Sequence, residues 1–174
     1  STWSKNFYND RKMYIMDLDG SNLKCITTDL DQTPGPPFWS DNSLGVYFNV
    51  REFGQSNVYY TNLSGKITKV SQGNHMLTMN DLVGNNAVAT WTNPSNPSDI
   101  VSFSVKKFNK IDRLTDVNND IFYNVEFGKV EEINYKSVDG KIVQGWVVKP
   151  PQFDSNKKYP LVLRIHGGPH SMYN

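Results

Sequence analysis

The sequence of 174 residues predicts a mainly β chain, in which a partial β-propeller is followed by the first strands of an α/β sheet. Three observations support this prediction. Short apolar strands alternate with turns from residue 11 to residue 115, similar units recur every 42 to 45 residues, and a later apolar strand stops at paired glycines. A period of that length, built from short strands alone, is typical of propeller blades.

Three predicted hairpins establish the period. They share two short strands around a turn and cover residues 13–27 with Asp19-Gly20, residues 58–70 with Ser64-Gly65, and residues 101–114 with a turn at 106–109. Leu18, Leu63 and Val105 hold equivalent places and are 45 and 42 residues apart. Each hairpin therefore corresponds to the same pair of strands in successive blades.

A second set of strands repeats with the same spacing. Residues 45–48 follow a turn at Asp41-Asn42, and residues 87–90 follow a turn at residues 84–86, which is 42 residues later. Two nearly complete blades are predicted, at residues 31–70 and 75–115, after the tail of an earlier blade at residues 3–27. The prolines before Phe38 and after Asn93 lie where no ladder hydrogen bond is needed.

Aromatic side chains in these strands are expected to pack blade against blade. They are Trp39, Tyr47, Phe48, Tyr59, Tyr60, Trp91 and Phe103. Fewer than three blades cannot close a ring, so we expect the remainder of the same polypeptide to cover their faces. Without that cover, the exposed propeller edges offer a surface for self-association.

The repeat ends within residues 116–127, and residues 124–130 are interpreted as a linker. The predicted domains are residues 1–128, the C-terminal blades of a propeller, and residues 129–174, the truncated start of a second domain. In the second domain we expect strands at 130–135 and 142–148, a turn at 137–140, and a polar loop at 153–158.

The stretch from Leu161 to His170 carries the clearest chemical prediction. Residues 161–165 are expected to form a buried strand that ends at His166-Gly167-Gly168-Pro169. Paired glycines allow a tight loop whose backbone N–H groups point outward, as an oxyanion hole requires. Strand, hairpin, strand, long loop, strand and glycine loop is also the order in which an α/β-hydrolase sheet begins. The plainer alternative is that Gly-Gly-Pro is only a turn.

Several segments resemble the acylaminoacyl-peptidase and dipeptidyl aminopeptidase branch of the prolyl oligopeptidase family. They are residues 39–42 (WSDN), 59–65 (YYTNLSG), 139–146 (DGKIVQGW), 149–151 (KPP), 158–161 (KYPL) and 166–170 (HGGPH). The resemblance implies a seven-bladed propeller that caps a serine-hydrolase domain and admits only short peptides. It also implies that the backbone N–H of Gly168 is one oxyanion donor, while His166 and Gly167 shape the loop.

The chain departs from the family pattern because it contains no Gly-x-Ser-x-Gly nucleophile elbow. The family's serine, aspartate and histidine triad is expected after residue 174, and Ser171 is interpreted as a loop or helix-start serine. Both ends of the chain look cut, so it is interpreted as a fragment of a longer protein. We therefore expect this chain alone to hydrolyse nothing.

The charge and hydropathy of the sequence argue against two classes of protein, those that bind nucleic acid and those that bind or span a membrane. A net charge of +1 with dispersed charges predicts no nucleic-acid or membrane partner, and no apolar run reaches the length of a membrane span. The single cysteine, Cys25, is expected to pack in a strand and mildly favours a reducing, cytoplasmic location.

No cofactor or metal is predicted. Residues 17–20 (DLDG) are interpreted as a hairpin turn rather than a calcium loop, and the glycines between His166 and His170 exclude helical metal spacing. His75 is interpreted as a surface or core histidine, and Glu131-Glu132 as exposed or structurally paired rather than as an amine-binding pair. The sequon at Asn62 has meaning only in a secreted protein.

Three function classes stay open on the residues alone: a serine peptidase for short peptides, a propeller interaction module without catalysis, and an esterase of the α/β-hydrolase type. The 42 to 45 residue repeat disfavours the esterase. The residues leave open whether the peptidase would remove acylated residues or dipeptides, or cut internally.

Overall fold

The computed structural model describes residues 10–167 and 172, which form two compact units. The first unit contains residues 10–116 with Met172, and the second contains residues 117–167. Strands outnumber helical residues in both units, and the described part of the chain has no helix long and apolar enough to cross a membrane. The division into propeller blades at residues 1–128 and the start of a second domain at residues 129–174 stays a prediction.

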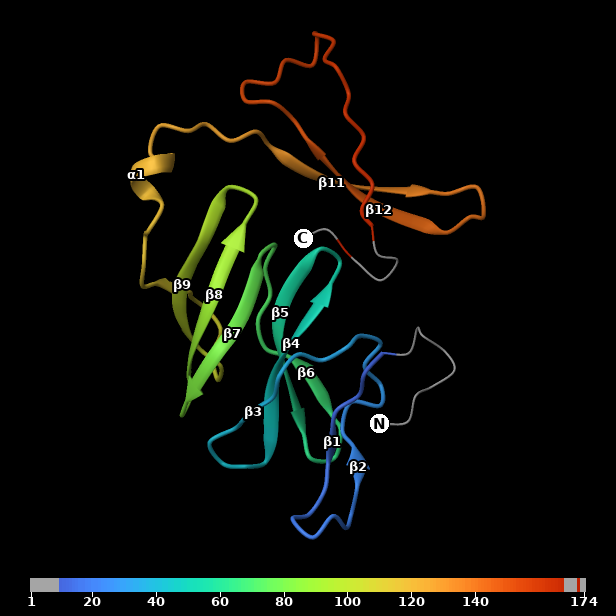
Figure 1. Ribbon diagram of the computed structural model, residues 1–174, viewed down its shortest axis with the longest axis vertical. Coiled ribbons are helices and arrows are strands. Elements are labelled where there is room, and N and C mark those ends of the chain that lie inside the picture. The colour runs from blue at the N-terminus through green and yellow to red at the C-terminus, as the bar shows by residue number, and fades with distance from the viewer. Residues whose placement is uncertain (1–9, 168–171, 173–174) are drawn as a thin grey trace. The chain divides into compact units, whose positions relative to one another are not determined.

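The first unit is built on two four-stranded antiparallel meanders (Figure 1). One contains β3 (Phe38–Trp39), β4 (Gly45–Glu52), β5 (Gln55–Asn62) and β6 (Ile67–Lys69). The other contains β7 (Met76–Val83), β8 (Asn86–Asn93), β9 (Asn96–Ser104) and β10 (Asp112–Arg113). Each meander pairs its strands in chain order, as in a propeller blade, which confirms the partial propeller predicted from the period.

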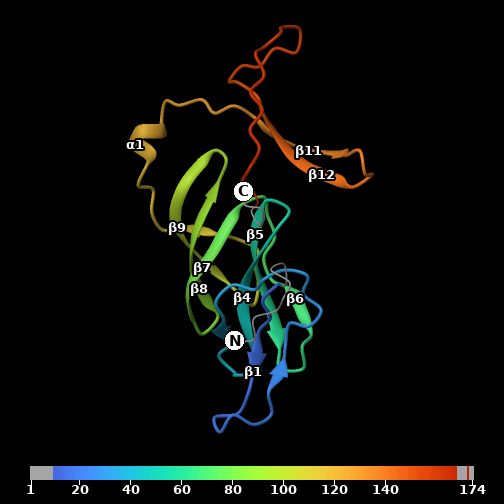
Figure 2. The same ribbon diagram turned by 45° about the vertical axis from the view of Figure 1, so that its right-hand side comes forward.

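A single parallel pair, Ser56 with Met76, joins the two meanders into one eight-stranded sheet. Before them, β1 (Tyr14–Ile15) and β2 (Lys24–Cys25) form the short hairpin expected from an earlier blade. Its turn contains Gly20 at a φ of 86°, a conformation that glycine adopts without steric cost. Figure 2 shows this hairpin and the strands β7, β8 and β9 from a second direction.

Two apolar clusters fill the first unit. One contains Ile26, Leu30, Val46, Phe48 and Val50, and the other contains Tyr47, Val58, Leu77, Met79, Ala87, Ala89, Val101, Phe103 and Val105. Side chains alternate across each strand, so β4 supplies Val46 and Phe48 to one cluster and Tyr47 to the other. The first meander is thus covered on both faces, as a blade between two neighbours must be.

The aromatic side chains pack as expected, with one exception. Trp39 is 57% exposed, so the prediction that it packs between blades is wrong. Phe38 and Trp39 are adjacent in the two-residue strand β3 and point to opposite faces. Phe38, opposite Tyr47, packs against one cluster, whereas Trp39, opposite Val46, lies on the other face in the edge strand β3, beyond the cover of the second cluster.

The second unit contains α1 (Asn119–Phe122) and the hairpin of β11 (Val130–Lys136) and β12 (Ile142–Val148). The two strands pair antiparallel along their whole length, from Val130 with Val148 to Lys136 with Ile142, as predicted. The single-turn helix was not predicted, because residues 116–127 show no helical period. Phe122 at its end lies 5.4 Å from the ring of Phe127.

Candidate functional site

The predicted oxyanion segment lies at the end of the second unit and differs from the expected strand. Residues 161–167 adopt no regular structure, and the apolar side chains at 161, 162, 163 and 165 are 79–90% exposed. The prediction of a buried strand at 161–165 is therefore wrong for this chain. A strand needs a ladder partner and apolar cover, and the described hairpin β11–β12 pairs with neither edge of this segment.

Two of the three predicted loop residues are described. The His166 ring nitrogen Nδ1 lies 2.9 Å from the carbonyl oxygen of Gly167. A Cβ added at Gly167 would meet nothing within 4 Å, so this position has open space around it. Gly168, the expected oxyanion donor, lies outside the described residues, as do Pro169, His170 and Ser171.

The acidic pair at the start of β11 is used structurally. Lys129 and Lys149 place their Nζ atoms 2.9 and 2.6 Å from the two carboxylate oxygens of Glu131. Hydrogen bonds from Lys149 and Lys129 hold the pKa of Glu131 below its usual value. Glu132 accepts hydrogen bonds from the amides of Asn134 and Gln144. The interpretation of both glutamates as structurally paired is confirmed.

The first unit holds a cavity of about 380 Å³ at one end of the second meander. We call it the His75 cavity and define it by His75, Trp91, Val101, Phe108, Ile111 and Arg113, with Gln72, Asn109 and Lys110 at its rim. Burial lowers the pKa of His75, so the imidazole is neutral at pH 7. The interpretation of His75 as a surface or core histidine is refined, because the side chain is half-buried and lines this cavity.

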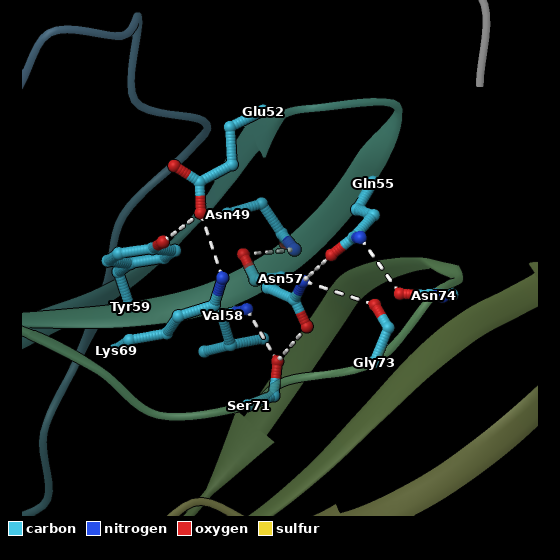
Figure 3. Close-up of polar contacts among 10 residues, drawn as sticks. All are labelled: Asn49, Glu52, Gln55, Asn57, Val58, Tyr59, Lys69, Ser71, Gly73 and Asn74. Carbon is cyan, nitrogen blue, oxygen red and sulfur yellow. Dashed lines mark hydrogen bonds and ion pairs between the residues drawn. The ribbon is translucent and has the colours of Figure 1, made fainter. Parts of the chain in front are cut away.

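A hydrogen-bonded network fixes the connection that carries His75 (Figure 3). Ser71 donates to Asn57 Oδ1 at 3.1 Å and accepts from the backbone N–H of Val58 at 2.8 Å, and both Asn57 and Ser71 are buried. Gln55 donates to Asn74 at 2.9 Å. The backbone of β5 holds the same segment, since the Ser56 N–H donates to the His75 carbonyl at 2.9 Å.

A second polar cluster lies further along β5, around Tyr59. Glu52 accepts hydrogen bonds from the Tyr59 hydroxyl and from Lys69 Nζ, and Lys69 Nζ also lies 5.4 Å from the centre of the Tyr59 ring. Burial disfavours the ionised form of Glu52, but the hydrogen bonds from Lys69 and Tyr59 outweigh it and lower its pKa. The carboxylate of Glu52 is thus paired, and the cluster has the structural role of joining β4, β5 and β6.

Asn49 on β4 clamps the first blade to β7. Its Nδ2 donates to the Leu77 carbonyl at 2.6 Å, and its Oδ1 accepts from the Met79 N–H at 2.8 Å. The carboxamide thus pairs with β7 as a peptide group of a neighbouring strand would. It fixes the strand that begins directly after His75.

We expect Asn49→Ala to lower the free energy of unfolding of the first unit by about 2 kcal/mol, because the Met79 N–H loses its Asn49 acceptor and the Leu77 carbonyl keeps only the hydroxyl of Ser56. Urea denaturation followed by circular dichroism measures this change. Asn86→Ala, at an exposed asparagine of β8, is the matched control and should have little effect. Equal losses in the two variants would contradict the clamp.

A second, more polar cavity of about 270 Å³ lies at the other end of the meanders. Ser40, Tyr47, Tyr60 and Lys106 line it, and the Tyr47 and Tyr60 rings are 4.9 Å apart. Burial raises the pKa of Tyr47, which is therefore a neutral phenol. No group of three or more potential metal-ligating side chains is found among residues 10–167 and 172.

Sequence reasoning placed His166 and Gly167 in a loop, but it did not bring His75 and Trp91 together. They are 16 residues apart and were interpreted separately. The signal that could have joined them is the strand register, since Trp91 pairs with Leu77, two residues after His75.

Comparisons with known proteins identify relatives of the chain. No family model matches it. The uncharacterized peptidase YuxL of Bacillus subtilis strain 168 is 28% identical over 178 residues, which cover 93% of this chain and 27% of that protein. Dipeptidyl-peptidase 5 of Porphyromonas gingivalis is 26% identical over 162 residues, which cover 92% of this chain and 24% of that protein. The chain thus spans about a quarter of the length of these curated relatives.

Solved structures share the fold. An acylaminoacyl peptidase of Pyrococcus horikoshii matches with a TM-score of 0.76 at 24% identity, over 98% of this chain and 25% of that chain. An acylaminoacyl peptidase in complex with Z-Gly-Gly-Phe-chloromethyl ketone matches with a TM-score of 0.73 at 24% identity, over 93% of this chain and 24% of that chain. Together with the peptidase relatives, these likenesses confirm the resemblance to peptidases of the prolyl oligopeptidase family.

Proposed function

Because the relatives of this chain are peptidases, we propose that it is part of a serine-type peptidase that cleaves short peptides through an acyl-enzyme. The observation that carries the proposal is the relationship to named peptidases over more than nine-tenths of the chain. The sequence His166-Gly167-Gly168-Pro169 supports the serine mechanism, because such a loop supplies oxyanion donors in α/β-hydrolases.

In the proposed reaction, a serine hydroxyl supplied by the rest of the protein attacks the carbonyl carbon of the scissile peptide bond. The hydroxyl proton passes to a base, and the carbonyl electron pair moves onto oxygen as a tetrahedral intermediate forms. The N–H of Gly168 donates to that oxygen, which stabilises the transition state by about 3 kcal/mol. The intermediate then expels the amine, which takes up a proton, and water later hydrolyses the acyl-enzyme.

The two blades have a separate role in this proposal. They form part of a propeller that restricts access, so that short peptides enter and folded proteins do not. Their packing supports the role, since the first blade carries apolar clusters on both faces and is clamped to the next blade by Asn49. Closely packed blades deform little, which is the property that a wall needs to exclude large substrates.

The test compares the whole protein with the 174-residue chain. We expect the whole protein to hydrolyse N-acetyl-alanine p-nitroanilide or a dipeptidyl p-nitroanilide, and a fluorophosphonate to abolish hydrolysis by labelling one serine outside these residues. The chain alone should release no p-nitroaniline above the uncatalysed rate. Whole protein that neither hydrolyses these substrates nor reacts with the fluorophosphonate would refute the peptidase and favour the interaction module.

A further inference from the structure

The second cavity, of about 270 Å³, has walls from both blades, and we call it the Tyr47 cavity. The residues used below to define it are Ser40, Asp41, Tyr47 and Tyr60 from the first blade and Asn85 and Lys106 from the second. Its volume is just below the range of sites for drug-sized ligands, and its walls are mostly polar. These two properties indicate a small polar ligand.

Tyr47 brings to this cavity a hydroxyl group that the protein leaves without a partner. The residue is only 7% exposed, and its hydroxyl makes no hydrogen bond to the described residues. Within the described part of the chain, the unpartnered polar atoms that are sealed from solvent are His75 Nε2 and Trp91 Nε1, so the Tyr47 hydroxyl keeps an accessible surface. Because Tyr47 lines the cavity, the partner of this hydroxyl must come from what the cavity holds.

Tyr60 lies beside Tyr47 and is directed to the same end of the strands. The two residues pair across β4 and β5, and their ring centres are 4.9 Å apart. A Cβ added at Gly45 would lie 2.4 Å from the Tyr60 hydroxyl oxygen, so the missing side chain makes room for this phenol. Glycine within a strand often marks such a close approach. The Tyr60 hydroxyl therefore lies at the first residue of β4, next to the β3–β4 turn that forms one wall of the cavity.

The walls of the cavity are held in place by hydrogen bonds. In the β3–β4 turn, Ser40 Oγ lies 2.9 Å from both Asn42 Oδ1 and the Gly45 carbonyl oxygen. In the second blade, the Val105 N–H donates to the Asn85 carbonyl at 2.9 Å, which fixes the backbone directly before Lys106. A ligand that enters therefore finds a preformed site and loses little affinity to the ordering of loops.

Two opposite charges lie on this cavity without partners. Asp41 and Lys106 both line it, and neither forms an ion pair with the other or with another described residue. A simple anion would be repelled by Asp41, and a simple cation would be repelled by Lys106. A molecule that carries both charges is complementary to both residues.

We propose that the Tyr47 cavity binds a small free α-amino acid as its zwitterion. The ammonium group pairs with Asp41, and the carboxylate accepts from Lys106 and from the Tyr47 hydroxyl. The small side chain packs on the ring of Tyr60. The proposal does not depend on the proposed hydrolysis, because binding breaks no bond.

The test titrates L-alanine into the chain labelled with carbon-13 in its tyrosine rings. The Tyr47 and Tyr60 resonances are identified by their loss in Tyr47→Phe and Tyr60→Phe. We expect alanine to shift both resonances saturably, with a Kd on the order of 1 mM, while the resonances of Tyr14 and Tyr135 stay unchanged. N-acetyl-L-alanine lacks the ammonium group and L-alaninamide lacks the carboxylate, so each should bind about tenfold more weakly than alanine near neutral pH.

Three variants assign the two charges. Asp41→Asn should bind alanine no better than N-acetylalanine, and Lys106→Gln should bind it no better than alaninamide. Lys107→Gln changes the exposed neighbour that does not line the cavity, so it is the matched control and should bind alanine with unchanged affinity. An unchanged Tyr14 resonance reports that the first unit of each variant is folded.

Several results would overturn the proposal. One is that the Tyr47 and Tyr60 resonances do not move when alanine is added. Another is that either analogue binds as tightly as alanine, which would make the cavity a simple anion or cation site. A third is that Asp41→Asn and Lys106→Gln bind alanine as tightly as Lys107→Gln does.

Discussion

Phe48→Ala should lower the free energy of unfolding of the first unit by about 3–5 kcal/mol. Phe48 has no exposed surface and lies in β4 among Ile26, Val46 and Val50. Its ring stacks on that of Tyr59, with centres 6.3 Å apart. Truncation removes the apolar contact and leaves a cavity between the β1–β2 hairpin and the first blade, because a packed core collapses only partly. Chemical denaturation followed by far-ultraviolet circular dichroism measures the loss.

The β4–β5 hairpin, which carries Phe48, offers a matched control. Phe53, at its turn, is 71% exposed, and Phe53→Ala should change the stability by less than about 1 kcal/mol. Phe48→Leu, which keeps most of the volume, should fall between the two alanine variants. If Phe48→Ala destabilised the unit no more than Phe53→Ala, the cluster around Phe48 would not hold the blades together.

Much of the fold could be predicted because strands and turns are local. The hairpin turns at Gly20 and Gly65 are three-residue loops whose last residue has positive φ, a position that favours glycine. A blade is a set of such hairpins, so its period is visible in a single sequence. The β4–β5 turn was less visible, since Phe53 stands at a φ of 50°, where asparagine is usual, before Gly54.

The predictions that were wrong concern features that depend on residues distant in the sequence. Residues 161–165 have the apolar pattern of a buried strand, but burial requires partners on both edges and both faces. Trp39 was expected to be buried because it is aromatic, although its burial depends on which face of a two-residue strand is covered. Strand propensity and hydrophobicity are properties of a residue, whereas the burial of its side chain depends on which other parts of the folded chain pack against it.

Of the candidate sites, the one made of consecutive residues was found from the sequence, and the one formed by the fold was not. His166 and Gly167 were found because a loop motif is contiguous in sequence. His75 and Trp91 were not found as a pair because they meet only through the register of β7 and β8. Their unsatisfied nitrogen atoms become visible only when every hydrogen bond in the unit is accounted for.

The second large effect is expected in catalysis. In the whole protein, Gly168→Pro should lower kcat for a peptide substrate by about 100- to 1,000-fold, because proline has no backbone N–H to donate to the oxyanion. KM should change far less, since the donor acts mainly on the charge that forms in the transition state. Steady-state kinetics with a peptide p-nitroanilide measure both constants.

Gly168→Ala separates the missing donor from the added bulk, because alanine keeps the N–H and adds only a methyl group. It should retain far more activity than Gly168→Pro, and the two variants should have the same unfolding midpoint as the unmodified protein. Reaction of the serine with a fluorophosphonate should slow in Gly168→Pro, since phosphonylation also places charge on an oxygen in the hole. If Gly168→Pro kept a third or more of the kcat, the oxyanion donor would have to be another group, and the glycine loop would be only a turn.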